Sequence, residues 1–373
     1  MKIVHVINSL DIGGAERLLI DTLQELKRKG IDVTLILLCN RESLFLKKLR
    51  DSGFDNIIFL TKGSIYNPKL IFKLVKILGK FDIVHAHLFP SQYFVVIAKI
   101  IGNLSIKIII TEHSTKNKRT ENKILAQIDK WIYTHYDNII CITNEVYKGL
   151  TQHLRNSNNL KLIYNGINLL AFQTAVKYNY SDLLSFGITI SEDNILLIQI
   201  SAFREPKDHL TLLKVMRELP KKYILLLVGD GKTKKEYKDL ATKMNLNQQV
   251  YFLGNRNDVP KLLKTAHISI LSTDWEGFGL VAIESMAAGI PFIGTRVGGL
   301  IELLRDAGET FEKKDHAELK NIIVEISNSN VTRNNMIQSG LKKSKNYDLS
   351  LMVDKYIALY FETMNTYETI LPK

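Results

Sequence analysis

Short apolar runs alternate with amphipathic stretches along the first part of the chain. Residues 2–7 (KIVHVI) are rich in β-branched side chains, a glycine pair follows at Gly13 and Gly14, and residues 15–29 have the apolar spacing of a helix. The next apolar run, residues 32–38 (DVTLILL), completes a β-α-β unit and implies parallel strands. The alternation continues with strands predicted at 57–60, 82–86, 107–111 and 138–142, and helices at 68–79, 91–101 and 121–135. Because the strands are continuously apolar, we expect a sheet covered on both faces.

The alternation restarts after residues 156–194, a stretch that is poor in regular signals. The second series predicts strands at 195–200, 223–228, 250–253, 268–271 and 291–294, with helices at 207–219, 232–244, 280–288 and beyond about residue 315. We therefore expect an α/β protein with two doubly wound domains joined near residues 165–185. Ligands of such sheets bind beyond the carboxyl ends of the strands, so we expect the site in the cleft between the domains.

The composition is that of a globular protein large enough for two domains. Of the 373 residues, 46% are hydrophobic and 24% are charged, which excludes wholesale disorder. The two cysteines, Cys39 and Cys141, exclude a disulfide scaffold and a thiolate-based metal site. The most apolar window, residues 93–101, is far shorter than the roughly 20 residues that span a bilayer. The first residues lack a signal-peptide pattern, so we expect a cytoplasmic protein.

The positive charge is concentrated in the first part of the chain. Residues 1–165 hold 24 Lys and Arg against 14 Asp and Glu, a net charge of +10 out of +12 for the whole chain. A basic surface attracts phosphates, nucleic acid or anionic lipid. The helix predicted from Pro68 carries a stripe of lysines beside an apolar stripe, namely Lys69, Lys73, Lys76 and Lys80 beside Leu70, Ile71, Leu74, Val75 and Leu78. It is either a helix on the inner face of the cell membrane or an ordinary surface helix packed on the sheet.

The candidate chemistry lies in the string Glu276-Gly277-Phe278-Gly279-Leu280, which runs into a predicted helix containing Glu284. Free backbone N–H groups at a helix start can receive a diphosphate. The two glutamates, one before the helix and one two turns later, are spaced to hold hydroxyls on two parts of one long ligand. Alternatively, Glu276 is a capping acid and Glu284 a solvated helix acid.

This string resembles the Glu-x7-Glu signature of retaining nucleotide-sugar glycosyltransferases of family 4 (glycosyl transferases group 1), which have the GT-B architecture. Other strings resemble the motifs of that family in the same order: Gly13-Gly14-Ala15-Glu16, Asp82-Ile83-Val84-His85-Ala86-His87, Thr111-Glu112-His113, Tyr164-Asn165-Gly166-Ile167, Phe203-Arg204-Glu205-Pro206-Lys207-Asp208-His209, Gly229-Asp230-Gly231 and Val297-Gly298-Gly299. The resemblance covers essentially the whole chain.

The resemblance implies two Rossmann-like domains facing across a deep cleft: an acceptor domain, 1–168, and a donor domain, 169–351, with a final helix at 352–373 packing back on the first. It also implies transfer of a sugar from a nucleoside-diphosphate sugar to a glycan or lipid-linked acceptor, with retention of the anomeric configuration, in bacterial surface polysaccharide biosynthesis. We expect a UDP-sugar donor, from the frequency of such donors in the family. No cofactor and no metal are expected.

The resemblance also implies roles for individual residues. Lys207 would contact the diphosphate and neutralise charge on the leaving group, and the backbone of Gly277, Phe278, Gly279 and Leu280 would add N–H donors. Glu284 would hold the ribose and Glu276 the transferred sugar. His113 would approach the sugar from the first domain, unless it is a core or capping histidine. Gly14 would allow close approach on that side.

Three positions in this pattern stay open. The family commonly has an arginine five residues before Lys207, where this chain has Ala202, and Arg204 is the candidate substitute. Arg256 either stacks on the nucleotide base or is a solvated loop arginine. For His85 and His87 we expect different surroundings, one in the core and one near the cleft, with no third metal ligand in register.

Two other classes of function are considered. A nucleotide-sugar epimerase or hydrolase of the same fold is disfavoured by the Glu276–Glu284 string. A basic nucleic-acid-binding protein is suggested by the charge alone, but no nucleic-acid motif is present, and Trp131, Tyr133 and Tyr136 are followed by apolar residues that indicate packing. We therefore expect no nucleic-acid partner.

Overall fold

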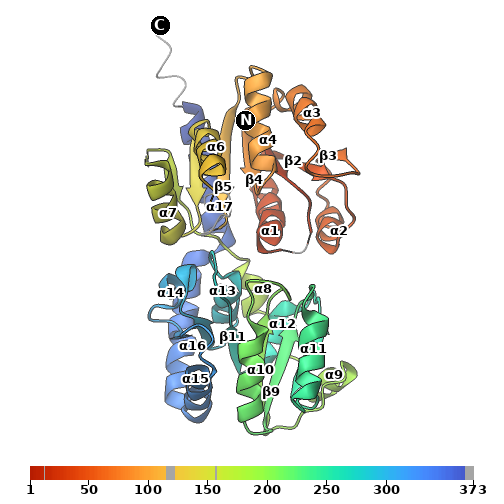
Figure 1. Ribbon diagram of the computed structural model, residues 1–373, viewed down its shortest axis with the longest axis vertical. Helices are drawn as coiled ribbons and strands as arrows, with labels where there is room; N and C mark the ends of the chain where they lie inside the picture. The colour runs from red at the N-terminus through yellow and green to blue at the C-terminus, as the bar shows by residue number, and fades with distance from the viewer. Residues whose placement is uncertain (12, 115–121, 156–157, 366–373) are drawn as a thin grey trace. The chain divides into compact units, whose positions relative to one another are not determined.

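The computed structural model describes residues 1–11, 13–114, 122–155 and 158–365. It divides into two compact units, the first made of Met1–Gly166 with the segment from Leu349 onward, and the second of Ile167–Asp348 (Figure 1). The chain thus leaves the first unit at Gly166 and returns to it with its last helix. Each unit is described separately below.

The first unit is built on a parallel sheet with the strand order β3-β2-β1-β4-β5-β6-β7. Its strands are β1 (Lys2–Ile7), β2 (Asp32–Cys39), β3 (Ile57–Thr61), β4 (Ile83–His87), β5 (Lys107–Glu112), β6 (Asn138–Cys141) and β7 (Leu160–Leu162). The register pairs His5 of β1 with His85 of β4, and His87 of β4 with Thr111 of β5. Polar side chains of three neighbouring strands therefore lie side by side in an otherwise apolar sheet.

Two groups of helices cover this sheet. In the first group, α1 (Gly14–Arg28) packs against both α2 (Leu44–Asp51) and the returning helix α17 (Leu349–Asn365). In the second group, α4 (Ser91–Ile101) packs on β1, β4 and β5 and against α3 (Lys69–Leu78), and its Tyr93 hydroxyl donates to Asp129 of α6 (Lys123–Thr134). The remaining helix, α7 (Asn144–Leu154), packs on α6. Val353, Tyr356 and Tyr360 of α17 are buried, which anchors the end of the chain in this unit.

The second unit repeats the plan with the strand order β10-β9-β8-β11-β12-β13, again with all strands parallel. Its strands are β8 (Ile195–Ile200), β9 (Tyr223–Val228), β10 (Val250–Gly254), β11 (Ile268–Leu271), β12 (Phe292–Thr295) and β13 (Glu309–Phe311). One group of packed helices consists of α10 (His209–Glu218), α11 (Lys234–Lys243) and α15 (His316–Asn328). The other consists of α8 (Leu169–Gln173), α12 (Val259–Thr265), α13 (Leu280–Ala287) and α16 (Asn330–Ser344). Shorter helices, α9 (Tyr180–Ser185) and α14 (Gly298–Leu304), complete the unit.

The strand order reverses at the same place in both units, between β1 and β4 in the first and between β8 and β11 in the second. The expectation of two doubly wound, parallel α/β domains is confirmed. Ligands of such sheets bind beyond the carboxyl ends of the strands at the reversal. We therefore expect functional residues in the loops after β4, β5, β8 and β11.

The predicted elements agree with the structure, but others were missed. The sequence analysis did not predict α2, α7, α8, α9, α12, α14, β7 or β13; most of these are short, but α7, with 11 residues, is as long as α4. Position 121 of one predicted helix, and 366–373 of the final one, lie outside the described residues. Within the described part of the chain, no helix combines the length and the apolar character needed to cross a membrane.

Candidate active site

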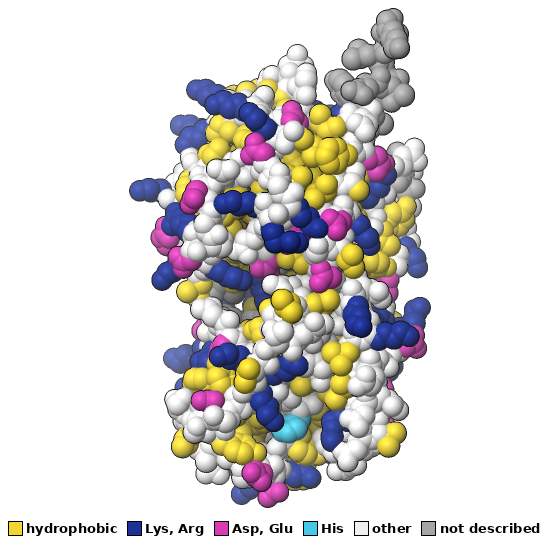
Figure 2. Space-filling model, turned by 180° about the vertical axis from the view of Figure 1, so that it is seen from behind, with side chains coloured by type: hydrophobic (Ala, Val, Ile, Leu, Met, Phe, Trp, Pro, Cys, Tyr) yellow, Lys and Arg dark blue, Asp and Glu magenta, His cyan; other side chains and the backbone are white. Residues whose placement is uncertain are grey.

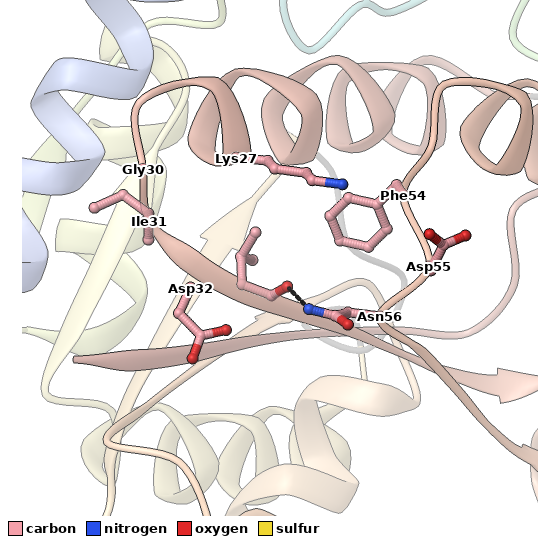
Figure 3. Close-up of a pocket in the computed structure, with 8 residues that line it drawn as sticks. Lys27, Gly30, Ile31, Asp32, Phe54, Asp55 and Asn56 are labelled. Atoms are coloured by element: carbon pink, nitrogen blue, oxygen red, sulfur yellow. Dashed lines mark hydrogen bonds between the residues drawn. The ribbon is translucent and has the colours of Figure 1, made fainter.

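The hollow drawn in Figure 3 lies at the amino edge of the first sheet, between the end of α1 and the starts of β2 and β3. Lys27, Asp32 and Phe54 line it, and the Asn56 side chain donates to the carbonyl of Val33 at 3.5 Å. Parallel sheets bind their ligands at the opposite, carboxyl edge. The hollow is therefore not the candidate site.

In the loop before α13, the backbone of Gly277 lies against the backbone of Gly299. Gly279 caps the helix with φ +87°, a left-handed conformation that favours glycine, and no side chain caps the helix start. A Cβ added to Gly299 would lie 2.4 Å from the carbonyl oxygen of Gly277, so no larger residue fits there. Among the described residues, no acceptor lies within hydrogen-bond reach of the N–H groups of Leu280 and Val281 at the start of α13, as an anion site requires.

Lys207 and Glu276 meet at this loop although 69 positions separate them in the sequence. The Lys207 ammonium forms an ion pair with Glu276 Oε2, and the two side chains are 18% and 19% exposed. Glu276 Oε1 accepts a hydrogen bond from the backbone of Gly277 at 3.1 Å, so its carboxylate stays in the loop and does not cap the helix. The predicted alternative of a capping acid is therefore wrong for Glu276.

Lys207 is held in place by the loop that follows β11. It forms an antiparallel bridge with Thr273, the backbone N–H of Asp208 donates to the Ser272 carbonyl at 3.0 Å, and the N–H of Asp274 donates to the Pro206 carbonyl at 2.8 Å. Backbone hydrogen bonds therefore join the loop after β8 to the loop after β11 before any ligand binds. This pre-organises the ammonium next to the start of α13.

Glu284 lies inside α13 and is only 3% exposed. The alternative of a solvated helix acid is therefore wrong. Buried carboxylates are retained where they bind a specific partner, because their desolvation is costly. Glu276 lies in the loop before α13 and Glu284 inside the helix, which keeps the predicted order of the two acids.

The turn that carries Ala202 and Arg204 is fixed by its backbone, whereas the Arg204 side chain is exposed. The N–H of Phe203 donates to the Asp230 carbonyl at 2.9 Å, and a Cβ at Gly231 would lie 2.3 Å from the Phe203 carbonyl oxygen. The close contact explains the glycine at position 231. Among the described residues, the Arg204 guanidinium makes no ion pair, so it is not engaged at the Lys207–Glu276 pair.

Arg256 is fixed by three side chains that the sequence analysis did not identify. Two of its N–H groups donate to the two carboxylate oxygens of Asp258, at 2.8 and 2.5 Å, and its guanidinium lies 4.3 Å from the centre of the Phe186 ring. The Tyr178 hydroxyl donates to the same carboxylate, and Asp258 raises the pKa of Arg256. Arg256 is 24% exposed and is not a free, solvated loop residue.

In the first unit, Gly14 is exposed at the start of α1, whose N-cap Gly13 has no side-chain bond. His113 directly follows β5 at the carboxyl edge of the sheet and is half-buried. Its Nε2 lies 3.4 Å from His87 Nδ1, and burial lowers the pKa of His113 to about 4. His113 is therefore neutral at pH 7 and hydrogen-bonded on its inner side.

The expectation for His85 and His87 is wrong. Residues two apart on a strand point to the same face, and the two rings stack with centroids 4.4 Å apart, both buried. A third histidine, His5, is in register with His85 on β1, and His5 Nδ1 lies 2.9 Å from His87 Nε2. Nitrogens of these three rings all lie within 4.8 Å of one another, so a third potential metal ligand does exist. The period-two spacing of His85 and His87 was the signal that the sequence analysis misinterpreted.

The predicted membrane helix, α3, buries its apolar stripe. Leu70, Ile71, Leu74 and Leu78 are buried, as expected of an ordinary surface helix, and Lys73 donates to the Leu60 carbonyl of β3 at 2.5 Å.

The apolar side chains that are exposed in this unit include a set on α6, namely Ile124, Leu125, Ile128 and Trp131. On the face displayed in Figure 2, Lys and Arg side chains are interspersed with hydrophobic ones.

Comparisons with known proteins cover both units. Residues 12–169 match the family described as Glycosyltransferase Family 4, and residues 182–343 match Glycosyl transferases group 1. The UDP-Gal:alpha-D-GlcNAc-diphosphoundecaprenol alpha-1,3-galactosyltransferase of Escherichia coli is 24% identical over 381 residues, 97% of each chain. The N-acetyl-alpha-D-glucosaminyl L-malate synthase of Bacillus anthracis is 26% identical over 296 residues, 76% of this chain and 75% of the synthase.

Among solved structures, Anabaena HepE in complex with UDP-glucose superposes with a TM-score of 0.84 at 21% identity, over 98% of this chain and 100% of HepE. WaaG, a glycosyltransferase involved in lipopolysaccharide biosynthesis, superposes with a TM-score of 0.72 at 15% identity, over 96% of this chain and 99% of WaaG. Fold and matches together define the class of protein as a sugar-transferring enzyme with two Rossmann-like domains. The chain belongs to glycosyltransferase family 4 and has the GT-B fold. The family, fold and enzyme class predicted from the sequence are confirmed.

Proposed function

We propose that this glycosyltransferase moves a sugar from a UDP-sugar to a lipid-linked glycan acceptor, with retention of the anomeric configuration, during bacterial surface polysaccharide synthesis. The observation that carries the proposal is the Lys207–Glu276 pair beside the uncapped start of α13. It brings a cation from the loop after β8 next to a carboxylate and backbone N–H groups from the loop before α13, and a diphosphate with an attached sugar requires all three. The relatives add support, since one acts on a diphosphoundecaprenol-linked sugar and HepE was crystallised with UDP-glucose.

The diphosphate is assigned to Lys207 and to the backbone N–H groups of Gly277, Phe278, Gly279 and Leu280. In the free enzyme the Lys207 ammonium already has a partner, Glu276. A diphosphate that arrives at Lys207 therefore competes with or joins this pair. The ammonium neutralises charge that develops on the leaving diphosphate when the bond from the sugar carbon C1 to the phosphate oxygen breaks.

The sugar and the ribose are assigned to the two glutamates. Glu276 accepts hydrogen bonds from hydroxyls of the transferred sugar, and the buried Glu284 accepts those of the ribose. The acceptor hydroxyl oxygen forms the new bond to C1 while the bond from C1 to the diphosphate oxygen breaks, and the hydroxyl proton passes to the leaving nucleoside diphosphate. Since Glu276 acts on the group being transferred, its contribution belongs to turnover more than to nucleotide binding.

The remaining residues are assigned supporting contacts. His113 contacts the transferred sugar, Gly14 lets the backbone approach it, and Arg256 contacts the base with the guanidinium that Asp258 orients. Arg204 is assigned to the diphosphate as the substitute for the arginine missing at Ala202. No cofactor and no metal are assigned, and elemental analysis of the purified enzyme tests this.

The decisive experiment is a thermal-shift screen against UDP, GDP, ADP and their sugar conjugates, followed by NMR of the product formed on an undecaprenyl-diphosphate sugar. We expect UDP to raise the melting temperature most, by mass action. The product should keep the anomeric configuration of the donor. Incubation with the donor alone separates the alternatives, because an epimerase produces the epimer and a hydrolase the free sugar. A GDP preference or an inverted product contradicts the proposal.

The acceptor also implies a surface for the membrane. We place the enzyme on the inner face of the cell membrane, bound through its first unit, which carries most of the net positive charge. The exposed apolar side chains of α6, with Lys123 and Lys130 on the same helix, match an anionic lipid surface in chemistry. No binding to nucleic acid is expected, and a filter-binding assay with single-stranded DNA and RNA tests this.

A further inference from the structure

A continuous series of hydrogen-bond contacts links α17 to His113 through the middle of the first sheet. We call it the histidine chain; its members, in order, are Tyr356, Thr111, His85, Tyr360, His5, His87 and His113. The contacts are Tyr356 Oη to Thr111 Oγ1 (3.4 Å), Thr111 Oγ1 to His85 Nε2 (2.7 Å), His85 Nδ1 to Tyr360 Oη (2.7 Å), Tyr360 Oη to His5 Nε2 (3.3 Å), His5 Nδ1 to His87 Nε2 (2.9 Å) and His87 Nδ1 to His113 Nε2 (3.4 Å).

The inner rings of the chain are neutral. His5 and His85 are 0% exposed and His87 is 4% exposed. Burial lowers the pKa of His5 to about 3 and holds the pKa values of His85 and His87 well below 6.5. A neutral imidazole has one N–H donor and one bare nitrogen acceptor. Each ring must therefore donate on one side and accept on the other.

If the hydroxyls of Thr111 and Tyr360 also donate along the histidine chain, two arrangements of the protons are possible. In the first, every group donates toward His113: Tyr360 donates to His5, His5 to His87, and His87 to His113. The proton of His113 itself is then on its outer nitrogen, Nδ1. In the second, every bond is reversed, and Nδ1 of His113 is a bare acceptor.

The far end of the chain selects between the two arrangements. In the first, the Tyr356 hydroxyl donates to Thr111, which donates to His85. In the second, Thr111 must donate to Tyr356, and the Tyr356 proton has no other acceptor among the described residues. Tyr356 is 2% exposed, and a buried donor without a partner is strongly disfavoured. Only the first arrangement satisfies every donor.

We infer that the histidine chain fixes the tautomer of His113, so that its Nδ1–H faces outward as a neutral hydrogen-bond donor. Tyr356, Tyr360, His5 and His87 are then positioning residues, which act on the substrate only through His113. The inference rests on the proposed contact of His113 with the sugar for its effect on turnover. An Nδ1–H donor suits a sugar hydroxyl oxygen, and it excludes His113 as a general base through that nitrogen.

The test is NMR of the full-length enzyme, labelled with ¹⁵N at histidine. The spectra are recorded in the absence of the nucleotide sugar. Long-range ¹H–¹⁵N spectra distinguish protonated from bare ring nitrogens, and His113→Gln assigns the signals. We expect one set of His113 signals, with the proton on Nδ1. In Tyr356→Phe the Thr111 hydroxyl keeps His85 as its acceptor, so the first arrangement and the single set of His113 signals should persist. In Tyr356→Met the sulfur can only accept, so Thr111 can donate in either direction; His113 should then show both tautomers, and kcat should fall with an unchanged KM for the nucleotide sugar.

Matched variants separate this effect from general damage. Tyr136→Phe removes another buried hydroxyl of the first unit, one that donates to the Gln92 carbonyl and is not part of the histidine chain. This variant should leave the His113 signals and kcat unchanged. Thr111→Ser keeps the linking hydroxyl and should preserve the wild-type spectrum. Tyr360→Phe cuts the histidine chain in the middle, but a proton on Nε2 of the buried His5 would then have no acceptor, so His113 should keep its proton on Nδ1.

Three results overturn the inference: a wild-type His113 with its proton on Nε2, a spectrum unchanged by Tyr356→Met, or a stoichiometric metal on the cluster, because a coordinated nitrogen cannot share a hydrogen bond. The spectra need no substrate. If His113→Gln leaves turnover intact, the proposed contact of His113 with the sugar is wrong. The spectra still test whether the histidine chain fixes the tautomer of His113.

Discussion

The carboxyl edges of the two sheets are equivalent in topology but opposite in chemistry. Beyond β8, β11 and β12, buried polar side chains bond to loop backbone, as Gln199 does to the N–H of Ser272 and Thr295 to the N–H of Thr273. These bonds fix the loops that present Lys207 and Glu276. Within β1, β4 and β5, His5, His85, His87 and Thr111 bond to one another and to tyrosines of α17 instead, and the series ends at the neutral His113.

The difference shows how one architecture can supply two kinds of recognition. The second unit offers fixed charge and free backbone N–H groups, which suit a diphosphate. The first unit offers uncharged hydrogen-bonding groups, which suit sugar hydroxyls. The predictions below test this division, starting with the largest expected effect.

Glu276→Ala should lower turnover by roughly 10²-fold or more, because it removes a contact made mainly to the group in transfer. The affinity for UDP should stay the same or rise, since Lys207 loses the carboxylate that pairs with it. Steady-state kinetics and calorimetry measure the two quantities. Loss of UDP binding would mean that the roles of Glu276 and Glu284 are exchanged.

Lys207→Ala should weaken UDP binding by about 10- to 100-fold, since a charge-assisted bond to phosphate contributes about 1.5–3 kcal/mol. It also leaves the Glu276 carboxylate without its cation, next to the incoming phosphates. Arg204→Ala is the matched variant, because its guanidinium is exposed and outside the pair. Equal losses of UDP affinity in the two variants would show that Arg204 replaces the arginine missing at Ala202. An unchanged UDP affinity in Arg204→Ala would show that Arg204 does not replace it.

Acid should destabilise the first unit more than the second. Folded His5 and His113 have pKa values near 3 and 4, below the 6.5 of unfolded histidine, so the unfolded chain binds more protons as the pH falls below 6.5. The stability that these neutral rings confer is complete above pH 6.5 and is lost progressively toward pH 4. Each fully shifted ring accounts for about 2 kcal/mol between pH 6.5 and 5.

Hydrogen exchange at pH 7 and pH 5 measures this loss unit by unit. In the described part of the chain, four histidines of the first unit have lowered pKa values, against His209 and His267 in the second. Amides of β1 and β4 should therefore lose more protection than those of β8 and β11. Equal losses in both sheets would contradict the assignment of neutral, buried rings.

The sequence predicted the two sheets because continuous apolar strands and amphipathic helices are local patterns. It also placed Glu276 before the helix that contains Glu284, whereas Lys207, predicted as the first residue of a helix, lies in the loop before α10. The pairing of Lys207 with Glu276, and the contact of Arg256 with Phe186, depend on which segments meet, and no local pattern encodes that. The contact of Arg256 with Asp258 is local, since two positions separate the residues.

The histidine chain was missed for a further reason. Tyr360 lies 275 positions from its partner His85, on a helix whose sequence gives no sign of which strand it covers. His5 and His85 become neighbours only through the register of β1 and β4. The two-residue spacing of His85 and His87 did carry information, since it places both on one face of a strand.

The smallest effect concerns the membrane, where α3 and α6 are compared. The enzyme should co-sediment with anionic vesicles at low salt and be released at about 0.5 M salt, because charges more than a few ångströms apart are then screened. A lysine near an anionic leaflet contributes about 1 kcal/mol. Reversing Lys69, Lys76 and Lys80 to Glu should therefore weaken vesicle binding if α3 faces the lipid; Lys73 is left in place because it bonds to β3.

Ile128→Ser with Trp131→Ser is the competing variant on α6, where both side chains are exposed, at 44% and 49%. We expect it to reduce vesicle binding more than the α3 reversal does at high salt, because apolar insertion is not screened, and less at low salt, where charge dominates. Turnover on a short water-soluble acceptor should survive in both variants, since neither touches the residues assigned to the donor. Binding that persists in both would place the lipid surface elsewhere on the enzyme, and no binding at any salt would mean that the lysines of the first unit are simply solvated.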